Sequence, residues 1–405
     1  MTPSIFISAG EASGEFYGAE LASALSRKAA PGTKLLGMGG TRMAAAGVEC
    51  IVRAEDVAVM GFTEVVLHLP RIWREFRKLK RAIRERRPAV AVLIDFPEIH
   101  FRLAKEFHRL GIPVIYFVSP QLWAWKQHRI RLVQKFVQRM LVIFPFEEKF
   151  YRERGVPAEF VGHPLADLPA PSITRAEFAA ENDLDPAKTW IGILPGSRLK
   201  EIQANLPEML AAAQGLMQSD PGEAGSAQSY GFLIPLAPTL DAAQRKAVAQ
   251  MAVSLGSGLD IHLAEDAQAV LFHSRASVVA SGTATVEAAL IGNPFVVIYR
   301  VSPLTYAIAR RLVKVPHVAM ANLIAGKRVV PELIQHDFTA ENIIQHLSRL
   351  LPDGPARQSM MKELGAVREA LQVPSAAGQS KESRAIETVA AIVLGELKAA
   401  LPAAP

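Results

Sequence analysis

The chain has 405 residues, of which 50% are hydrophobic and 21% charged, with a net charge of +6. That composition is typical of a globular protein long enough for two domains, and it excludes the disordered and fibrous classes. The first ten residues lack the basic and apolar regions of a secretory signal, and no apolar run is long enough to span a membrane. Cys50 is the only cysteine, which excludes a disulfide framework and favours a reducing, cytoplasmic location.

Short β-branched runs alternate with amphipathic segments of helical length, which predicts parallel strands joined by crossover helices. The expected strands of the first half are Ser4–Ser8, Lys34–Met38, Val90–Ile94, Val114–Val118 and Met140–Phe144. A second set comprises Trp190–Leu194, Phe232–Leu236, Leu259–Leu263, Ser277–Ala280 and Phe295–Tyr299. Prolines and small residues between the two sets indicate an interdomain connection.

The sequence therefore predicts an α/β protein with two Rossmann-like domains. The first domain is expected over residues 1–165, followed by a linker over 166–186 and a second domain over 187–345. Residues 346–405 are expected to form helices that end in an Ala/Pro tail, packing back on the first domain or on a partner subunit.

The positive charge is concentrated in one segment. Residues 71–87 hold nine Arg or Lys residues against Glu75 and Glu85, and an apolar segment, 57–70, precedes them. An apolar stretch too short to cross a bilayer, beside a basic helix, is typical of contact with a membrane surface. A solvated basic helix over a core segment is the alternative. The residues expected at the membrane are Met60, Phe62, Val66, Leu67, Arg71, Trp73, Arg74, Arg77, Lys78 and Arg81.

A glycine-bearing loop, GEASG, follows the first predicted strand. Such a loop would let a ligand approach the backbone and the start of the next helix. The spacing differs from the dinucleotide-binding fingerprint, because the glycines are too far apart and the acidic residue of that motif is missing. A plain tight turn is the alternative. The candidates for ligand contact are Gly10, Glu11, Ser13 and Gly14.

Two turns in the second half are suited to bind phosphate. The first breaks a strand at Pro195 and restarts as a helix, and Arg198 adds a planar charged donor beside it. A capped helix with a solvated arginine is the alternative there. The second turn, 281–285, is rich in hydroxyl groups, and Glu287 could accept hydrogen bonds from two ribose hydroxyls. Together they predict a nucleotide site formed by Gly196, Ser197, Arg198, Glu201, Ser281, Gly282, Thr283, Thr285 and Glu287.

Asp95 follows the predicted strand Val90–Ile94 directly, at the edge where open α/β sheets bind ligands. In that position it could act as general base on a hydroxyl group. A helix cap is the alternative role for an aspartate after a strand. Glu98 and His100 are further candidates for the base.

The next predicted strand leads into a segment that holds two of the four tryptophans. Aromatic planes beside polar groups are suited to sugar rings, which makes Ser119, Gln121 and Trp125 candidates for binding, although tryptophans of this kind also pack in cores. The pair Asp183 and Asp185 has the D-x-D pattern of metal-dependent sugar transferases, but it lies in a polar connector before a proline. It is expected to form a turn, and no metal or other cofactor is predicted.

Taken together, nine motifs resemble the lipid-A-disaccharide synthases, inverting glycosyltransferases of the GT-B fold in which two parallel sheets face each other across a cleft. The motifs are GEASG, VMGFTEV, LIDFPE, VSPQLWAWKQHR, LVIFPFEEKFY, GHP, LPGSRLKEI, SGTATVEAAL and ANLIAGKRVVPELIQ. The resemblance implies that UDP-2,3-diacylglucosamine is the donor, 2,3-diacylglucosamine 1-phosphate the acceptor, and a β-1,6-linked disaccharide 1-phosphate and UDP the products. It also implies a peripheral position on the inner face of the cytoplasmic membrane, where acylated substrates lie.

By the same resemblance, Asp95 corresponds to the family's essential aspartate and base, and Arg198 to its arginine on the donor diphosphate. Glu287 and the turn 281–285 correspond to the residues that bind the uridine ribose and the phosphate, and Asn322 corresponds to an asparagine of the cleft. The glycine loop and the tryptophan segment then lie on the acceptor side. The family usually has Asp after GEASG, whereas this chain has Glu15.

Two other functions compete with this interpretation. The UDP-sugar 2-epimerases share the two-domain architecture but use no acceptor lipid, and the basic-apolar segment argues against them. Nucleic-acid binding is suggested only by the isoelectric point of about 9.4, and it is not expected because few aromatic residues accompany the basic ones.

Overall fold

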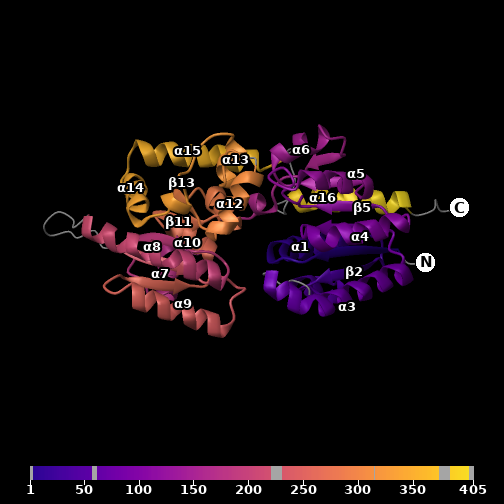
Figure 1. The fold of residues 1–405 in the computed structure, drawn as a ribbon, viewed down its shortest axis with the longest axis horizontal. Coiled ribbons are helices and arrows are strands. Elements are labelled where there is room, and N and C mark those ends of the chain that lie inside the picture. The colour runs from indigo at the N-terminus through magenta and orange to yellow at the C-terminus, as the bar shows by residue number, and fades with distance from the viewer. Residues whose placement is uncertain (1–2, 57–61, 220–229, 314, 374–383, 401–405) are drawn as a thin grey trace. The chain divides into compact units, whose positions relative to one another are not determined.

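The computed structural model describes residues 3–56, 62–219, 230–313, 315–373 and 384–400 (Figure 1). The chain divides into two compact units. The first unit comprises Met1–Asp167 together with Leu371–Pro405, and the second comprises Leu168–Ala370.

A seven-stranded, entirely parallel sheet forms the centre of the first unit. Its strands in spatial order are β3 (Glu49–Arg53), β2 (Lys34–Gly39), β1 (Ser4–Ala9), β4 (Val90–Ile94), β5 (Val114–Phe117), β6 (Arg139–Val142) and β7 (Ala158–Phe160). The helices of this unit are α1 (Ala12–Lys28), α2 (Thr41–Ala45), α3 (Phe62–Arg86), α4 (Pro97–Arg109), α5 (Ile130–Phe136), α6 (Pro145–Arg152) and α16 (Arg384–Ala400), with short 3-10 turns at Ala54–Asp56, Gln127–Arg129 and Pro164–Asp167.

Alternating residues of the central strands bury on opposite faces of this sheet. In β4, Val90 and Val92 pack in a core cluster with residues of α1 and α16, whereas Ala91 and Leu93 pack in a second cluster with residues of α3 and α4. Since both faces are covered, the strand is apolar throughout, as is usual for parallel sheets.

Helix α16 belongs to the first unit although it is last in the sequence. Its residues Ile386, Val389 and Val393 are buried in the cluster that includes β1 and β4. Glu396 of the same helix accepts hydrogen bonds from Gln138 and Arg139 at 2.8 Å each. The C-terminal segment is therefore part of the first core.

A six-stranded parallel sheet forms the centre of the second unit. Its strands in spatial order are β10 (Ile261–Ala264), β9 (Tyr230–Pro235), β8 (Thr189–Leu194), β11 (Ala276–Ala280), β12 (Phe295–Tyr299) and β13 (Glu332–Ile334). The helices are α7 (Arg175–Glu181), α8 (Leu199–Ser219), α9 (Ala242–Leu255), α10 (Ala267–His273), α11 (Thr283–Ile291), α12 (Pro303–Leu312), α13 (Met320–Ala325), α14 (Ala340–Leu350) and α15 (Pro355–Ala370), with a 3-10 turn at Gln335–Asp337.

All ten strands expected from the sequence are present, with ends that differ by at most two residues. The expectation omitted β3, β7 and β13. These strands lie at sheet edges and are short or interrupted by charged residues, so they lack the continuous β-branched run of a central strand.

The two units differ from the expected domain bounds in two places. Residues 166–186, expected as a linker, include α7, which begins with a capping box at Thr174 and buries Phe178 beside Trp190. Residues 346–370 stay with the second unit, and only 371–405 join the first. Asp183 and Asp185 form the expected turn, because Asp183 has a left-handed backbone and the Asp185 carboxylate accepts from the amide of Ala187.

Replacement of Ile386 tests whether α16 is part of the first core. We expect Ile386→Ala to lower the free energy of unfolding of the first unit by about 2–5 kcal/mol, because a buried side chain is truncated. Lys398→Ala, an exposed position of the same helix, should change it by less than about 0.5 kcal/mol. Calorimetry measures both variants, and equal stability of the two would contradict the assignment.

Candidate active site

Asp95 lies at the carboxyl edge of the first sheet, one residue beyond β4, and its amide donates to the Phe117 carbonyl at 3.1 Å. Both Asp95 and Phe96 have left-handed backbone angles, with φ of 49° and 50°. For residues other than glycine such a conformation costs roughly 1–3 kcal/mol, and it is concentrated at functional sites. The Asp95 side chain is mostly buried, and burial followed by the nearby Glu11 carboxylate raises its pKa to about 7.

Of the three residues expected as possible bases, only Asp95 combines partial exposure with a carboxylate whose pKa is near neutrality. His100 is fully buried, its two ring nitrogens lie 2.8 Å from the Ser8 hydroxyl and 2.6 Å from the Asp95 carbonyl, and burial lowers its pKa to about 4. Glu98 is exposed and binds Arg129 at 2.8 and 3.1 Å, and these hydrogen bonds lower its pKa. The geometry thus favours Asp95.

Packing within the chain explains the first glycine of the glycine loop, Gly10. A Cβ atom on Gly10 would lie 2.3 Å from the Phe96 ring, so a side chain at this position would have to displace that ring. A Cβ atom on Gly14 would make an ordinary contact at 3.6 Å. Glu11 and Ser13 are partly exposed at the start of α1, and their expected contact with an acceptor stays a prediction.

Glu15 caps α2, the helix that follows the neighbouring strand β2. Its carboxylate accepts the amide hydrogen of Arg42 at 2.8 Å, in the first turn of α2, and lies against Gly40. The carboxylate thus satisfies an amide that the short helix cannot bond internally. The reach of glutamate is sufficient for this role.

The tryptophan segment is fixed from beneath by a buried carboxylate that the sequence analysis missed. Glu147 accepts the Ser119 hydroxyl at 2.6 Å and the Trp123 indole at 2.9 Å, and burial raises its pKa to about 7. Ser119 and Trp123 are therefore internal, whereas Gln121 and Trp125 are exposed and remain available to a ligand. Glu147 lies in the motif LVIFPFEEKFY, at a position that also caps α6, which hid its second role.

The two turns expected to bind phosphate follow neighbouring strands of the second sheet. β8 pairs with β11, with Leu194 opposite Val279, so the turns that begin at Pro195 and Ser281 leave the same edge. Paired strands lie about 4.8 Å apart. The predicted convergence of these two turns is supported by this pairing.

In the first turn, the Glu201 carboxylate binds the donor groups that are expected to bind the diphosphate. Glu201 accepts the amide of Ser197 at 3.2 Å and the Arg198 guanidinium at 2.8 Å. Gly196 has a φ of 132°, and a Cβ atom there would lie 2.7 Å from the Glu201 carboxylate. The turn thus binds a carboxylate of the same chain, and the expected contact of Gly196, Ser197, Arg198 and Glu201 with a diphosphate stays a prediction.

In the second turn, Ser281, Gly282 and Thr283 are at least partly exposed, as a ligand contact requires. Thr285 is buried and its hydroxyl donates to the Gly282 carbonyl at 2.7 Å, so it shapes the turn, and direct contact with phosphate is not supported. Burial, with the Asp266 carboxylate nearby, raises the pKa of Glu287 to about 7. Its expected contact with ribose hydroxyls stays a prediction.

Asn322 makes its hydrogen bonds within the chain. Its amide oxygen accepts from the amides of Val329 and Val330 at 2.7 and 2.9 Å, and its amide nitrogen donates to the Val330 carbonyl and to Glu332, each at 2.9 Å. All four hydrogen-bonding positions of the side chain are thereby used. We expect Asn322 to hold this loop, and the predicted direct contact with a donor is not supported.

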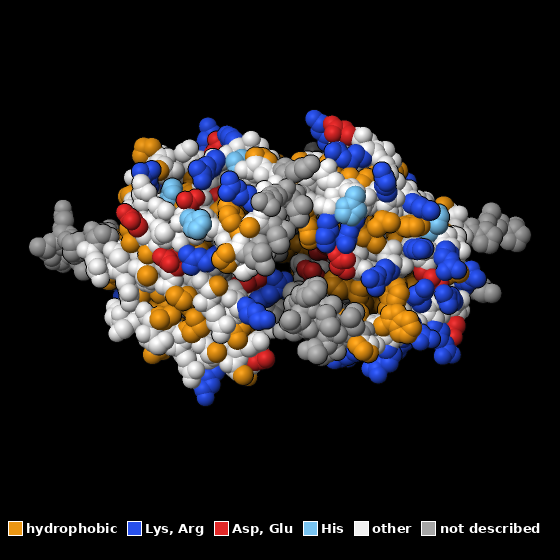
Figure 2. Space-filling view, viewed as in Figure 1, with side chains coloured by type: hydrophobic (Ala, Val, Ile, Leu, Met, Phe, Trp, Pro, Cys, Tyr) orange, Lys and Arg blue, Asp and Glu red, His pale blue; other side chains and the backbone are white. Residues whose placement is uncertain are grey.

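The basic helix α3 buries Leu79 and Ile83 in the first core, and its other side is charged (Figure 2). Trp73 is 59% exposed, and the guanidinium of Arg77 lies 4.7 Å from its ring centre. Carboxylates on the surface offset part of the charge, through ion pairs of Asp56 with Arg71, Glu75 with Arg74 and Lys78, and Glu85 with Arg81. Met60 lies outside the described residues, as do the side chains of Phe62, Val66 and Leu67.

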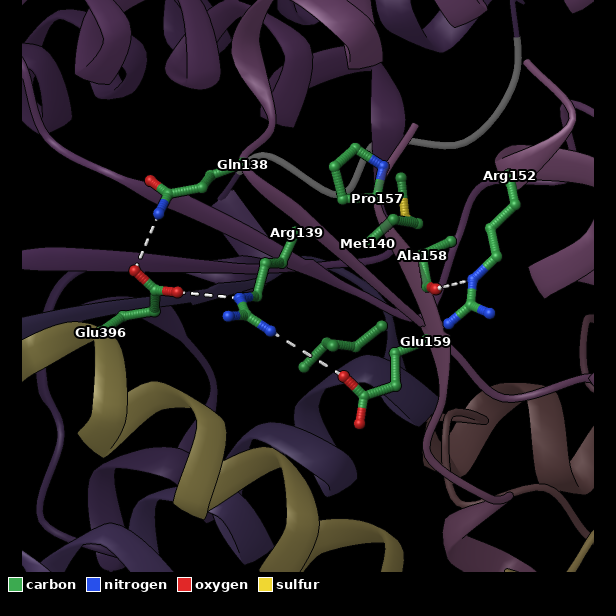
Figure 3. A pocket seen from close by; sticks show the side chains of 9 residues that line it. Gln138, Arg139, Met140, Arg152, Pro157, Ala158, Glu159 and Glu396 are labelled. Atoms are coloured by element: carbon green, nitrogen blue, oxygen red, sulfur yellow. Dashed lines mark hydrogen bonds and ion pairs between the residues drawn. The ribbon is translucent and has the colours of Figure 1, made fainter. Parts of the chain in front are cut away.

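A cavity of about 430 Å³ lies at the opposite edge of the first sheet from Asp95, where β6 and β7 begin (Figure 3). Its charged side chains are engaged internally, with Arg139 bound to Glu396 and Arg152 to the Ala158 carbonyl. It contains none of the predicted site residues.

Among the described residues, no helix is long and apolar enough to cross a membrane, and no three His, Cys, Asp or Glu side chains form a group that could hold a metal ion.

Residues 5–386 match the model of a family described as lipid-A-disaccharide synthetase. The lipid-A-disaccharide synthase of Acidobacterium capsulatum is 58% identical to the chain, over 94% of this chain and 95% of that protein. The chain belongs to the lipid-A-disaccharide synthase family. It is accordingly a glycosyltransferase of lipid A biosynthesis, and the family predicted from its motifs is confirmed.

Solved structures show the same fold at low sequence identity. The glycosyltransferase of kitacinnamycin has a TM-score of 0.60 at 15% identity, covering 98% of this chain and 99% of that one. UDP-GlcNAc 2-epimerase of Neisseria meningitidis, solved with UDP-GlcNAc, has a TM-score of 0.58 at 14% identity, covering 98% of this chain and all of that one. These likenesses confirm the GT-B fold and carry no conclusion about epimerase activity.

The influence of Glu11 on Asp95 gives a test of the proposed base. If Asp95 must be ionised to act, activity rises with pH through about 7, and Glu11→Gln removes one of the charges that raise this pKa. We therefore expect the midpoint of kcat/KM against pH to move to lower pH in Glu11→Gln. Glu98→Gln, whose carboxylate is paired with Arg129, should leave the midpoint in place. An unmoved midpoint in Glu11→Gln would count against Asp95 as the titrating group.

Proposed function

We propose that the chain joins a UDP-linked 2,3-diacylglucosamine to 2,3-diacylglucosamine 1-phosphate, giving the β-1,6-linked disaccharide 1-phosphate and UDP. The family supplies the class of reaction. One observation carries the catalytic assignment. Asp95 is mostly buried, its pKa is raised to about 7, and it lies in a strained turn at the carboxyl edge of its sheet.

In this mechanism Asp95 takes the proton of the acceptor 6-hydroxyl while that oxygen attacks the anomeric carbon of the donor. A base with a pKa near the working pH is effective, since it is both ionised and able to hold a proton. The bond from the anomeric carbon to the UDP oxygen breaks on the opposite face, which inverts the configuration. The sugar bond forms and UDP leaves as an anion.

The departing diphosphate needs positive charge and hydrogen-bond donors, and the second unit has both at its sheet edge. Arg198 offers a permanent charge, and the amide of Ser197 points at the same carboxylate that Arg198 binds. Fixed donors of this kind stabilise charge that develops in the transition state. We propose that they do so without a metal ion or other cofactor.

Both substrates carry acyl chains, so the enzyme must reach a membrane surface. We propose that α3, with exposed Trp73 and its cluster of arginines, contacts anionic lipid on the inner face of the cytoplasmic membrane. A homodimer through the C-terminal region stays a prediction. Nucleic acid is not an expected partner.

The proposed reaction is tested by incubating the purified protein with the acylated donor and acceptor and analysing the products by mass spectrometry. The expected products are the disaccharide 1-phosphate and UDP. Asp95→Asn should lower kcat by about a hundredfold or more with UDP affinity unchanged, because the base acts only in the transition state. Free acylated sugar or an epimerised donor in place of the disaccharide would refute the assignment, and near-normal turnover of Asp95→Asn would remove Asp95 as base.

Flotation with anionic vesicles tests the membrane contact. Replacement of Arg74, Arg77 and Arg81 by Gln removes three charges worth about 1 kcal/mol each near anionic lipid, so we expect vesicle affinity to fall by about a hundredfold. The same replacement at three exposed positions of the second unit is the control, namely Arg349, Lys362 and Arg368. Equal flotation of the two triple variants would discard α3 as the contact.

A further inference from the structure

We propose that Tyr116 and His100 are positioning residues, which hold the Asp95 carboxylate in its reactive place by binding its main-chain carbonyl. The Tyr116 hydroxyl donates to that carbonyl at 2.6 Å, and the His100 ring nitrogen Nδ1 lies 2.6 Å from the same oxygen. Both lone pairs of the carbonyl are thus engaged by side chains from different elements. The inference rests on the proposed role of Asp95 as base.

The hydrogen bonds decide which nitrogen of His100 carries the proton. A carbonyl oxygen can only accept, so Nδ1 must hold the hydrogen that lies between the two atoms. The ring is fully buried and its pKa is lowered to about 4, so the ring is neutral and Nε2 is unprotonated. The Ser8 hydroxyl, 2.8 Å from Nε2, must therefore donate to it. A chain of donors runs from Ser8 through His100 to Asp95.

The three side chains reach Asp95 because of the sheet register. Ser8 of β1 and Tyr116 of β5 are both paired with Leu93 of β4, which lies two residues before Asp95. His100 lies in the first turns of α4, which starts directly after the turn. Side chains from two flanking strands and from the following helix thus support one peptide group, that of Asp95.

The backbone at this position requires such support. Asp95 and Phe96 are consecutive left-handed residues with side chains, a conformation that persists only when its surroundings determine it. The Phe96 ring packs against Gly10, which fixes the conformation of Phe96. The two hydrogen bonds to the Asp95 carbonyl fix the conformation of Asp95. Without them the peptide could rotate, and the carboxylate would turn with it.

Rotation would also change the titration of Asp95. The ionisable groups near it are Glu11 directly before α1, His100 from α4 and Tyr116 from β5, while Glu98 is paired with Arg129. Because burial is the main cause of the raised Asp95 pKa, a carboxylate that turns toward water would titrate at lower pH. A shift of the pH midpoint therefore distinguishes a positioning role from a merely structural one.

The test compares Tyr116→Phe with Tyr151→Phe in the full-length enzyme. Each variant removes one hydroxyl that is buried and donates to a main-chain carbonyl, that of Asp95 for Tyr116 and that of Pro120 for Tyr151. We expect Tyr116→Phe to lower kcat by about ten- to a hundredfold, as a small misplacement of a reacting group does, with the KM for the donor within about twofold and the pH midpoint at lower pH. Tyr151→Phe should leave the pH midpoint at its wild-type value.

Ser8→Ala provides a second, milder variant, since it removes the donor to Nε2 and leaves the histidine in place. It should move kcat and the pH midpoint in the same direction as Tyr116→Phe, and UDP affinity measured by calorimetry should match the wild type in both. An unchanged kcat and pH midpoint in both variants would overturn the proposal, as would equal losses in Tyr116→Phe and Tyr151→Phe. If instead Asp95→Asn is active, the proposed base is wrong and the positioning inference is refuted with it.

Discussion

Every strand in both sheets runs parallel to its neighbours, and parallel strands place all their carboxyl ends on one edge. Because both faces of such a sheet are covered by helices, ligands bind at that edge and at its loops. Asp95 occupies this edge in the first unit, and the turns at Gly196 and Ser281 occupy it in the second. The chemistry of the protein thus follows from the direction of its strands.

At two strand ends of the first unit a second side chain holds a candidate site residue or segment. A buried carboxylate, Glu147, fixes the tryptophan segment. Tyr116 and His100 engage the carbonyl of Asp95. Such supporting contacts restrict the reactive groups to one geometry, which is what pre-organised catalysis requires.

The central strands and the candidate residues could be predicted from the sequence because their signals are local. A buried parallel strand is a continuous β-branched run, as in β4, and Asp95 or Ser281 is the first polar residue after such a run. The edge strands β3, β7 and β13 lack that run. The packing of α16 beside β1 and β4 is one of the two alternatives expected for residues 346–405. The point at which the chain leaves the second unit, Leu371, was not predicted, since no local pattern specifies it.

The partners of the site residues were not predictable, because they are distant in sequence and depend on register. Tyr116 reaches Asp95 only because β4 pairs with β5. Asn322 is a polar residue of the kind that contacts ligands, but its hydrogen bonds are made within the chain. An asparagine or a threonine has the same appearance in a sequence whether it binds a ligand or shapes a turn. Only the three-dimensional contacts distinguish the two.

A crystal structure of the protein with UDP tests the central claim most directly, namely that the carboxyl edge of the second sheet binds the nucleotide. The account predicts that the diphosphate contacts the Ser197 amide and Arg198, with the Glu201 carboxylate displaced from both, and that the ribose hydroxyls contact Glu287. UDP bound elsewhere, with the Arg198–Glu201 pair intact, would contradict it.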